Sequence, residues 1–182
     1  MGLVRLDKVA EELPIKVDRR PYLLQPERPP EGEPRPLREG ETETEMSPAW
    51  QERAQGAGVV MHRPKWSPNT VPAHEVTAYA KEQGRDGEFH HVAARAYWET
   101  GANLGDLETL KGISEACGLN WAELSSRLES GHYRQKVFQE YQAAREKGVR
   151  GTPTYMIGGE IIFGDLSVDD LREMVSQATK SI

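Results

Sequence analysis

The sequence predicts an α/β fold, and three observations lead to that prediction. The chain begins with a helical pattern that is followed closely by a strand pattern, as in an α/β unit. It ends with patterns for strand, tight turn, strand and helix. Between these ends, residues 50–147 are almost entirely helical in spacing. With 182 residues in all, we expect one α/β domain interrupted by an α-helical insertion.

The first helix and strand are predicted from apolar spacing. One apolar stripe with helical spacing consists of Leu3, Leu6, Val9, Ala10 and Leu13. Pro14 ends this helix. Ile15 and Val17 then alternate with polar residues, which predicts a short strand within residues 15–24. The alternation slips at Pro21, because proline cannot donate to a strand ladder.

The next segment has a very different composition. Residues 25–48 contain six prolines and seven glutamates but hardly any apolar side chains. Such a segment buries too little surface to offset its ordering entropy. We therefore expect residues 25–49 to form an extended or mobile surface connection, and we interpret Glu41, Glu43 and Glu45 as a solvated run.

Helix starts and stops are clear in the insertion. Thr70 with Pro72 opens one helix, Asp106 opens another, and Gly118 ends the latter. Asn120 with Glu123 forms a capping pattern for the helix that follows. The single cysteine and two of the tryptophans continue apolar helical faces, so we expect them to be buried: Cys117, Trp98 and Trp121.

The last segment is predicted to be a hairpin followed by a helix. Residues 154–157 and 161–163 are short apolar strands, and Gly158-Gly159 supplies the positive φ angles of a two-residue turn. A hydrophobic staple with a capping box then opens the helix, formed by Leu166, Ser167, Asp170 and Leu171.

Composition restricts the partners. Subtracting 29 acidic from 23 basic residues gives a net charge of −6, and no lysine-rich block is present, so we expect no nucleic-acid partner. No apolar run approaches the roughly 20 residues that span a bilayer, and no secretory signal pattern is present. A single cysteine fits a reducing compartment. We therefore expect a cytoplasmic protein without a membrane partner.

An ordered series of segments carries a resemblance to a known family. "GVRGTPTYMIGGEIIFGDLSVDDL" is preceded by "RRPYLLQPERPPEG", "HRPKWSPNTVPAHEVTAYAKEQG", "AYWETGANLGDLETL" and "ACGLN". In this order they resemble the DsbA-like branch of the thioredoxin superfamily, in particular FrnE-like dithiol oxidoreductases and 2-hydroxychromene-2-carboxylate isomerases. The resemblance implies a thioredoxin-like domain from residues 1–24 and 148–182, the connection 25–49, and a helical insertion at 50–147.

The resemblance also implies a substrate-binding loop. Taken alone, Pro153 is an ordinary trans proline at a strand start or a cis proline in a tight turn. In the family the Gly-x-Pro-Thr loop holds a cis proline, which here is Pro153 with Gly151 and Thr152. Because Pro153 has no N–H, the backbone of Thr152 is left free to pair with an extended substrate.

The resemblance also places the turn containing Trp66, Asn69 and Thr70 near the substrate cleft. Trp66 would form an apolar wall, and Asn69 would hydrogen-bond a polar ligand. The alternative is that Asn69 and Thr70 only cap the next helix. We predict no metal site, because the adjacent His90 and His91 diverge by about 100° on a helix.

The chain departs from the family at its start. The family has a first strand and a Cys-x-x-Cys turn before the helix that matches residues 2–12, and neither is present in the printed sequence. Three origins stay open: Met1 is an internal methionine of a longer reading frame, catalysis has been lost while binding is retained, or the start has been omitted. Translation of the DNA upstream of the Met1 codon distinguishes the first.

By resemblance, the predicted function is that of a protein thiol-disulfide oxidoreductase acting on a protein or small-molecule disulfide or thiol. Without the two cysteines we expect the chain to be inactive, so we assign no catalytic residue and no cofactor. One alternative is a glutathione-dependent isomerase or transferase, with a serine in place of the first cysteine. Another is a peptide-binding or dimerisation module, because a missing central strand leaves unpaired backbone that a partner strand or a homodimer would cover.

Overall fold

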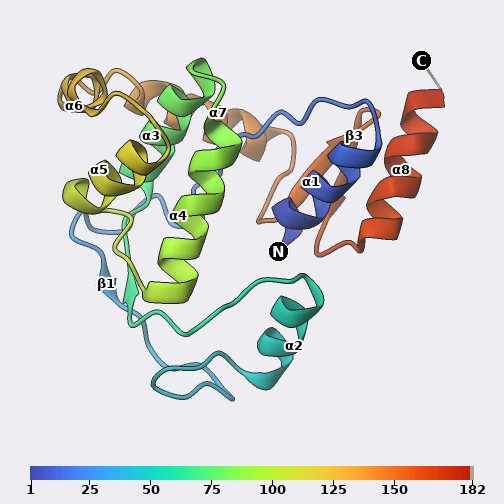
Figure 1. Cartoon of the computed structure of the whole chain (residues 1–182), viewed down its shortest axis with the longest axis horizontal. Helices are drawn as coiled ribbons and strands as arrows, with labels where there is room; N and C mark the ends of the chain where they lie inside the picture. Colours follow the sequence, from blue (N-terminus) through green and yellow to red (C-terminus); the bar gives the residue numbers. More distant parts are fainter. Residues whose placement is uncertain (181–182) are drawn as a thin grey trace.

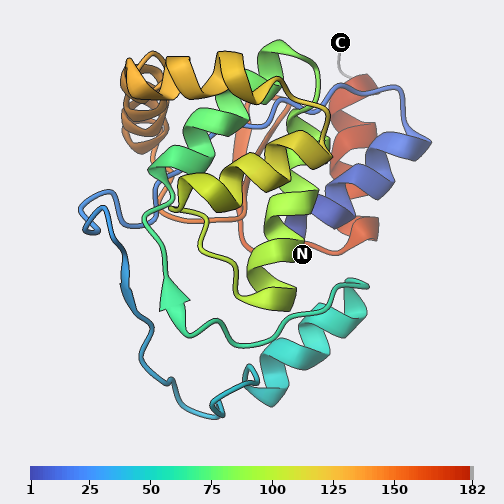
Figure 2. The same cartoon turned by 60° about the vertical axis from the view of Figure 1, so that its left-hand side comes forward.

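Two groups of elements lie side by side in the computed structural model, which describes residues 1–180 (Figures 1 and 2). Residues 181–182, the end of the predicted 148–182 segment, lie outside the described part. The elements in chain order are α1 (Gly2–Glu12), β1 (Glu33–Pro34), α2 (Pro48–Gly56), β2 (Trp66–Ser67), α3 (Val71–Glu82), α4 (Asp86–Thr100), α5 (Leu107–Ala116), α6 (Trp121–Glu129), α7 (Arg134–Glu146), β3 (Thr154–Ile157), β4 (Glu160–Phe163) and α8 (Val168–Lys180).

Helices α3 to α7 form one group around an apolar core. This core includes Val76, Tyr79, Phe89, Leu110, Cys117 and Leu124. The predicted caps are confirmed at two helices: the Asp106 carboxylate accepts a bond from the Thr109 N–H at 2.8 Å, and Asn120 accepts from the Glu123 N–H at 3.3 Å. These caps satisfy N–H groups that have no partner inside the helix.

The other group contains α1, α8 and the β3–β4 hairpin. The hairpin register pairs Tyr155 with Ile162, and Gly158 and Gly159 both have positive φ as the turn requires. Helices α1 and α8 lie beside each other (Figure 1). Their apolar sides meet the hairpin in a core that includes Val9, Tyr155, Leu171 and Val175.

The capping box before α8 is also confirmed. The Ser167 hydroxyl accepts a bond from the Asp170 N–H at 3.0 Å, and the Asp170 carboxylate accepts one from the Ser167 N–H at 3.1 Å. The first turn of α8 therefore begins where the sequence predicts.

The predicted strand within residues 15–24 is not formed. Its side chains do alternate in burial, with Ile15, Val17 and Arg19 more buried than Lys16 and Asp18. However, the described chain offers this segment no neighbouring strand with which to form a ladder. The alternation thus indicates which side of the segment faces the core. It does not indicate whether a neighbouring strand is present to form the hydrogen bonds of a ladder.

Most of residues 25–49 are exposed, as expected of a surface connection, but part of the segment is folded. Residues 33–67, which we call the arm, fold back on themselves: β1 pairs with β2 at the base, Glu45 bridges to His62, and α2 lies near the tip. The arm extends below α4 toward the N-terminus (Figure 1). There Met46, Ala54 and Met61 form a small core against which Met1 and Trp98 pack.

The architecture is thus the predicted α/β fold. Within residues 1–180, eight helices and few strands are consistent with a helical insertion. The domain boundaries 1–24, 25–49, 50–147 and 148–182 stay a prediction.

Candidate functional site

The loop before β3 lies directly against the first turn of α1. The peptide bond between Thr152 and Pro153 is cis. A Cβ atom added to Gly2 would lie 2.9 Å from Pro153 Cβ and 2.5 Å from the Tyr155 hydroxyl oxygen. Because such distances are shorter than real carbon contacts, the close approach of α1 to this loop depends on glycine at position 2.

The outer edge of β3 has unpaired backbone. In the hairpin register, Ile157 and Tyr155 exchange hydrogen bonds with β4, so the N–H and C=O groups of Thr154 and Met156 point away from it. Neither residue makes a backbone hydrogen bond outside the hairpin within residues 1–180. This edge is a template on which an extended chain can pair.

One face of the same hairpin exposes apolar side chains. Met156 is 56% exposed and Phe163 is 54% exposed. Both point to the face opposite Tyr155, since side chains alternate along a strand. The edge and this face together form an apolar surface with free hydrogen-bonding groups beside Pro153.

A cluster of charged residues joins α1, the loop after β4 and the arm. The Asp165 carboxylate pairs with Arg5 and also with Arg53 of α2, at 3.0 Å. Partial burial of Asp165 acts to raise its pKa, but the hydrogen bonds from Arg5 and Arg53 outweigh it, so the pKa is lowered. Asp165 therefore stays ionised and ties α2 of the arm to α1.

Tyr155 is an unusual member of this region. Its hydroxyl group is buried and has no hydrogen-bond partner within the described residues. Burial raises the pKa of the phenol, and the nearby Asp165 charge acts in the same direction. The phenol is therefore neutral at physiological pH, and its hydroxyl remains an unused donor next to Gly2.

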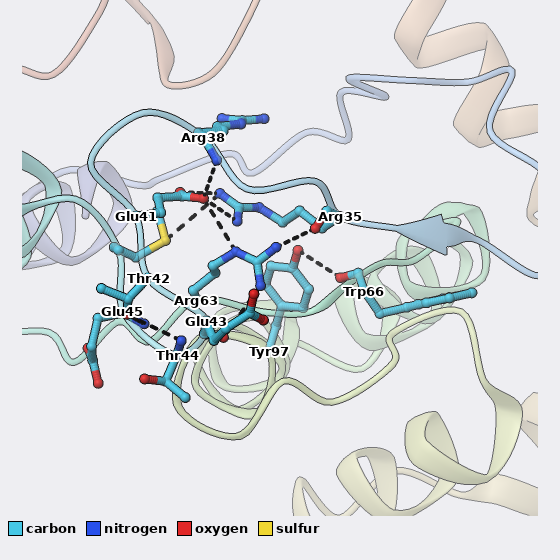
Figure 3. Close-up of polar contacts among 11 residues, drawn as sticks. Arg35, Arg38, Glu41, Thr42, Glu43, Thr44, Glu45, Arg63, Trp66 and Tyr97 are labelled. Atoms are coloured by element: carbon cyan, nitrogen blue, oxygen red, sulfur yellow. Dashed lines mark hydrogen bonds and ion pairs between the residues drawn. The ribbon is translucent and has the colours of Figure 1, made fainter.

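The arm is held together by a buried cluster of Arg35, Glu41 and Arg63 (Figure 3). Arg35 donates to both Glu41 carboxylate oxygens, and Arg63 Nε lies 3.4 Å from one of them. The Glu41 side chain is only 2% exposed. Hydrogen bonds from Arg35 lower its carboxyl pKa to about 2. Glu41 is thus a structural ion-pair partner, and the prediction that it is solvated is wrong.

The predicted residues Trp66, Asn69 and Thr70 lie at the base of the arm. The Asn69 side-chain amide donates to the Arg28 carbonyl at 2.7 Å, and its oxygen accepts from the Val71 N–H at 3.0 Å. Thr70 occupies the N-cap position of α3 but makes no side-chain capping bond. Both polar atoms of Asn69 are therefore engaged within the chain, while Trp66 lines a groove.

The two predicted parts of the cleft lie on different elements. Gly151, Thr152 and Pro153 form one loop next to Gly2, whereas Trp66, Asn69 and Thr70 lie on the side of the helical group. Met1 packs in the same small core as Trp98, and Trp98 lines the groove together with Trp66. The substrate-binding roles of these six residues stay predictions.

Cys117 belongs to a different core from Tyr155 and the arm. It is 1% exposed within the core of α3 to α7, and burial raises its thiol pKa. Its placement as a buried small hydrophobe is confirmed. In the described residues, no group of three or more His, Cys, Asp or Glu side chains is placed to hold a metal ion. No helix in residues 1–180 is long and apolar enough to cross a bilayer.

Comparison with known proteins identifies the family. A family model described as a DSBA-like thioredoxin domain matches residues 1–176. The chain belongs to this family. The DSBA-like chain is also 26% identical over 185 residues to the uncharacterised protein YwbO of Bacillus subtilis, covering 99% of this chain and 90% of YwbO.

Two solved structures resemble the DSBA-like chain in fold. A probable DsbA oxidoreductase from Streptomyces coelicolor superposes with a TM-score of 0.81 at 19% identity, covering 100% of this chain and 84% of that one. The structure of 2-hydroxychromene-2-carboxylate isomerase superposes with a TM-score of 0.60 at 24% identity, covering 73% of this chain and 64% of that one. At these identities the likeness shows the shared fold alone.

Sequence reasoning missed the charged and phenolic groups around the site. Arg5 and Asp165 form an ion pair although they are 160 positions apart in the sequence. In the sequence, Tyr155 has the pattern of an ordinary apolar strand residue. For Glu41 a weak signal existed in the neighbouring Arg35 and Arg38, but the buried partner Arg63 comes from beyond α2. Only the fold brings these groups together.

Proposed function

We propose that this DSBA-like chain binds a protein or small-molecule thiol or disulfide substrate beside Pro153 and does not carry out thiol-disulfide exchange by itself. The supporting observation is the unpaired edge of β3, where Thr154 and Met156 have free backbone groups next to the Pro153 loop. An extended substrate pairs with such an edge through main-chain hydrogen bonds, while the exposed apolar face contacts its side chains.

The proposed lack of exchange is supported by the chemistry of the single cysteine in the printed sequence. The attacking group in exchange is a thiolate that must reach the substrate sulfur. Cys117 is buried, which keeps its sulfur from reaching a substrate, and its thiol pKa is raised, which disfavours the thiolate. We therefore assign no catalytic residue, and we infer a reducing, cytoplasmic setting in which this thiol remains unmodified.

The test is an insulin reduction assay with dithiothreitol. We expect no turnover above the reductant alone, and the same result for Cys117→Ala, which controls for a hidden role of the thiol. Turnover that Cys117→Ala abolishes would contradict the proposal. Binding is measured separately with a cystine-containing peptide, so that loss of chemistry and loss of binding are distinguished.

A second candidate is a glutathione-dependent isomerase or transferase. It is favoured by the likeness in fold to 2-hydroxychromene-2-carboxylate isomerase over 73% of this chain. Glutathione would then be bound as cofactor in the cleft beside Pro153. Calorimetric titration with glutathione tests this candidate: heat of binding that a Pro153→Ala variant loses supports it, and no detectable heat counts against it.

A third candidate is a non-catalytic peptide-binding or dimerisation module. The exposed Met156 and Phe163 and the free β3 edge favour it, because surfaces of this kind are normally covered by a partner. Sedimentation velocity over a range of concentrations tests for a homodimer. A dimer that is dissociated by the Met156→Lys substitution would support this candidate. A chain that is monomeric at all concentrations would rule out dimerisation.

A further inference from the structure

The two groups of elements are packed separately. The core that contains Val9, Tyr155 and Leu171 shares no member with the core of α3 to α7. In the part of the chain that the structure describes, the closely packed pairs of helices or strands lie inside one group or within the arm. The two groups therefore meet as two bodies, each with its own core (Figure 1). Bodies of this kind commonly move relative to each other, unless a large apolar interface joins them.

Two segments connect the groups, and they contact each other. Residues 13–24 lead out of α1, and residues 147–153 lead back from α7 to β3. The Tyr22 hydroxyl donates to the Val149 carbonyl at 3.3 Å, so the two connections lie together at this point. Because both connections pass through one place, they can act as a single hinge.

Ion pairs join the two groups outside the hinge. His91 Nε2 of α4 lies 2.6 Å from an Asp7 carboxylate oxygen of α1, and Arg53 of the arm lies 3.0 Å from Asp165. The side chains of His91 and Arg53 are 38% and 46% exposed. Pairs with this exposure contribute little to stability. The apolar contact across the boundary comes from Met1, which packs on the small core of the arm.

Both carboxylates of these ion pairs have a further partner that does not belong to the opposite group. Asp165 also pairs with Arg5 of α1. Asp7 also accepts a bond at 2.7 Å from Arg19, which lies in the connection 13–24, while Arg19 is 3.6 Å from Asp86 of α4. Separation of the groups therefore leaves both carboxylates paired, and the cations that they release are already partly exposed. Opening thus avoids the high cost of an unpaired buried charge.

We propose that the two groups open and close as rigid bodies about this hinge, and that the His91–Asp7 and Arg53–Asp165 pairs are latches of the closed form. The Pro153 loop lies on one group, and the turn with Trp66 lies at the base of the arm beside the other. The motion therefore changes the opening between the two predicted parts of the cleft. This effect on substrate access rests on the proposed function, whereas the motion itself does not.

The experiment measures the distance between two spin labels by double electron–electron resonance, without any peptide. The labels are attached at Glu115→Cys in α5 and Glu173→Cys in α8, which are exposed positions. The native Cys117 stays in place, because its buried thiol does not react with the label. We expect two distance populations. Salt at about 1 M should raise the longer-distance population about threefold, since it screens exposed ion pairs.

Matched variants separate the latches from ion pairs in general. Arg53→Gln and His91→Gln should each raise the longer-distance population about threefold. The control is Arg172→Gln: Arg172 is 37% exposed and lies 2.6 Å from Glu12, but both residues belong to the same group, so the distances should not change. Distances that are the same in high salt and in both latch variants would overturn the proposal, and so would an equal change in Arg172→Gln. Because no peptide is present, this result is independent of whether the chain binds a substrate.

Discussion

The arm and the Pro153 side of the candidate cleft use their polar groups in opposite ways. In the arm and at its base, the side chains of Arg35, Glu41 and Asn69 bond within the chain. On the Pro153 side, the backbone of Thr154 and the hydroxyl of Tyr155 have no partner within residues 1–180. The comparison teaches that the bonded side chains of the arm hold its fold together, whereas the unpaired backbone along the β3 edge lies where we propose that a substrate binds.

The largest expected effect is on the arm side, from Glu41→Gln. This change leaves Arg35 and Arg63 buried without a counter-charge and should lower the free energy of unfolding by about 3 kcal/mol. The control is Glu45→Gln, whose side chain is 43% exposed and should change stability by less than about 0.5 kcal/mol. Urea denaturation of both variants measures the difference, and equal stabilities would show that the cluster does not hold the arm.

The same pair predicts a pH dependence. The Glu41 carboxyl pKa is about 2 in the folded chain, below its ordinary value of 4.5. Because the folded-state pKa is lowered, the stabilisation is fully present above pH about 4.5 and is lost as the pH falls toward 2. The stability difference between the parent chain and Glu41→Gln should therefore shrink between pH 5 and pH 2, and a constant difference would contradict it.

The next largest effect distinguishes Asn69 from its neighbour. Asn69→Ala removes the bonds to the Arg28 carbonyl and the Val71 N–H and should cost about 2 kcal/mol. Thr70→Ala should cost less than about 0.5 kcal/mol, because its side chain makes no capping bond. Thermal unfolding measures both. A stable Asn69→Ala variant with weakened peptide binding would instead place Asn69 among the substrate contacts.

The smallest effect concerns the Pro153 side. Gly2→Ala forces a Cβ atom against Pro153 and the Tyr155 hydroxyl; the better helix propensity of alanine offsets part of this cost, which leaves a net loss of about 1 kcal/mol. Tyr155→Phe removes an unpartnered buried hydroxyl and should be neutral or slightly stabilising. In the double variant, part of the Gly2→Ala loss should be recovered. A double-mutant cycle by urea denaturation checks this, and strict additivity would contradict the contact.

Local signals in the sequence predicted the features that depend on a few adjacent residues. The Ser167–Asp170 capping box, the Gly158-Gly159 turn and the Asn120 cap all form as expected, since each is decided within about four positions. The alternation of residues 15–24 correctly indicated which side is buried. It did not predict a ladder, because a strand requires a neighbour that local sequence does not specify.

The arm was missed for a physical reason. The composition of residues 25–49 counts each glutamate and proline without regard to its contacts, and by that count the segment is hydrophilic. Glu41 is buried because Arg35 and Arg63 neutralise and hydrogen-bond it, and Arg63 reaches it only after the chain has returned from α2. For the candidate site, sequence resemblance indicated the Pro153 loop, but the Tyr155 hydroxyl and the Arg5–Asp165–Arg53 cluster depend on tertiary packing.

The most direct test of the central claim is residue-resolved amide hydrogen exchange of the monomeric chain with and without a cystine-containing peptide. The account predicts that the Thr154 and Met156 amides exchange rapidly in the free chain and become protected when the peptide binds, while the already paired Tyr155 amide changes little. Protection of Thr154 and Met156 without peptide, or no change with saturating peptide, would contradict the claim that this edge receives the substrate.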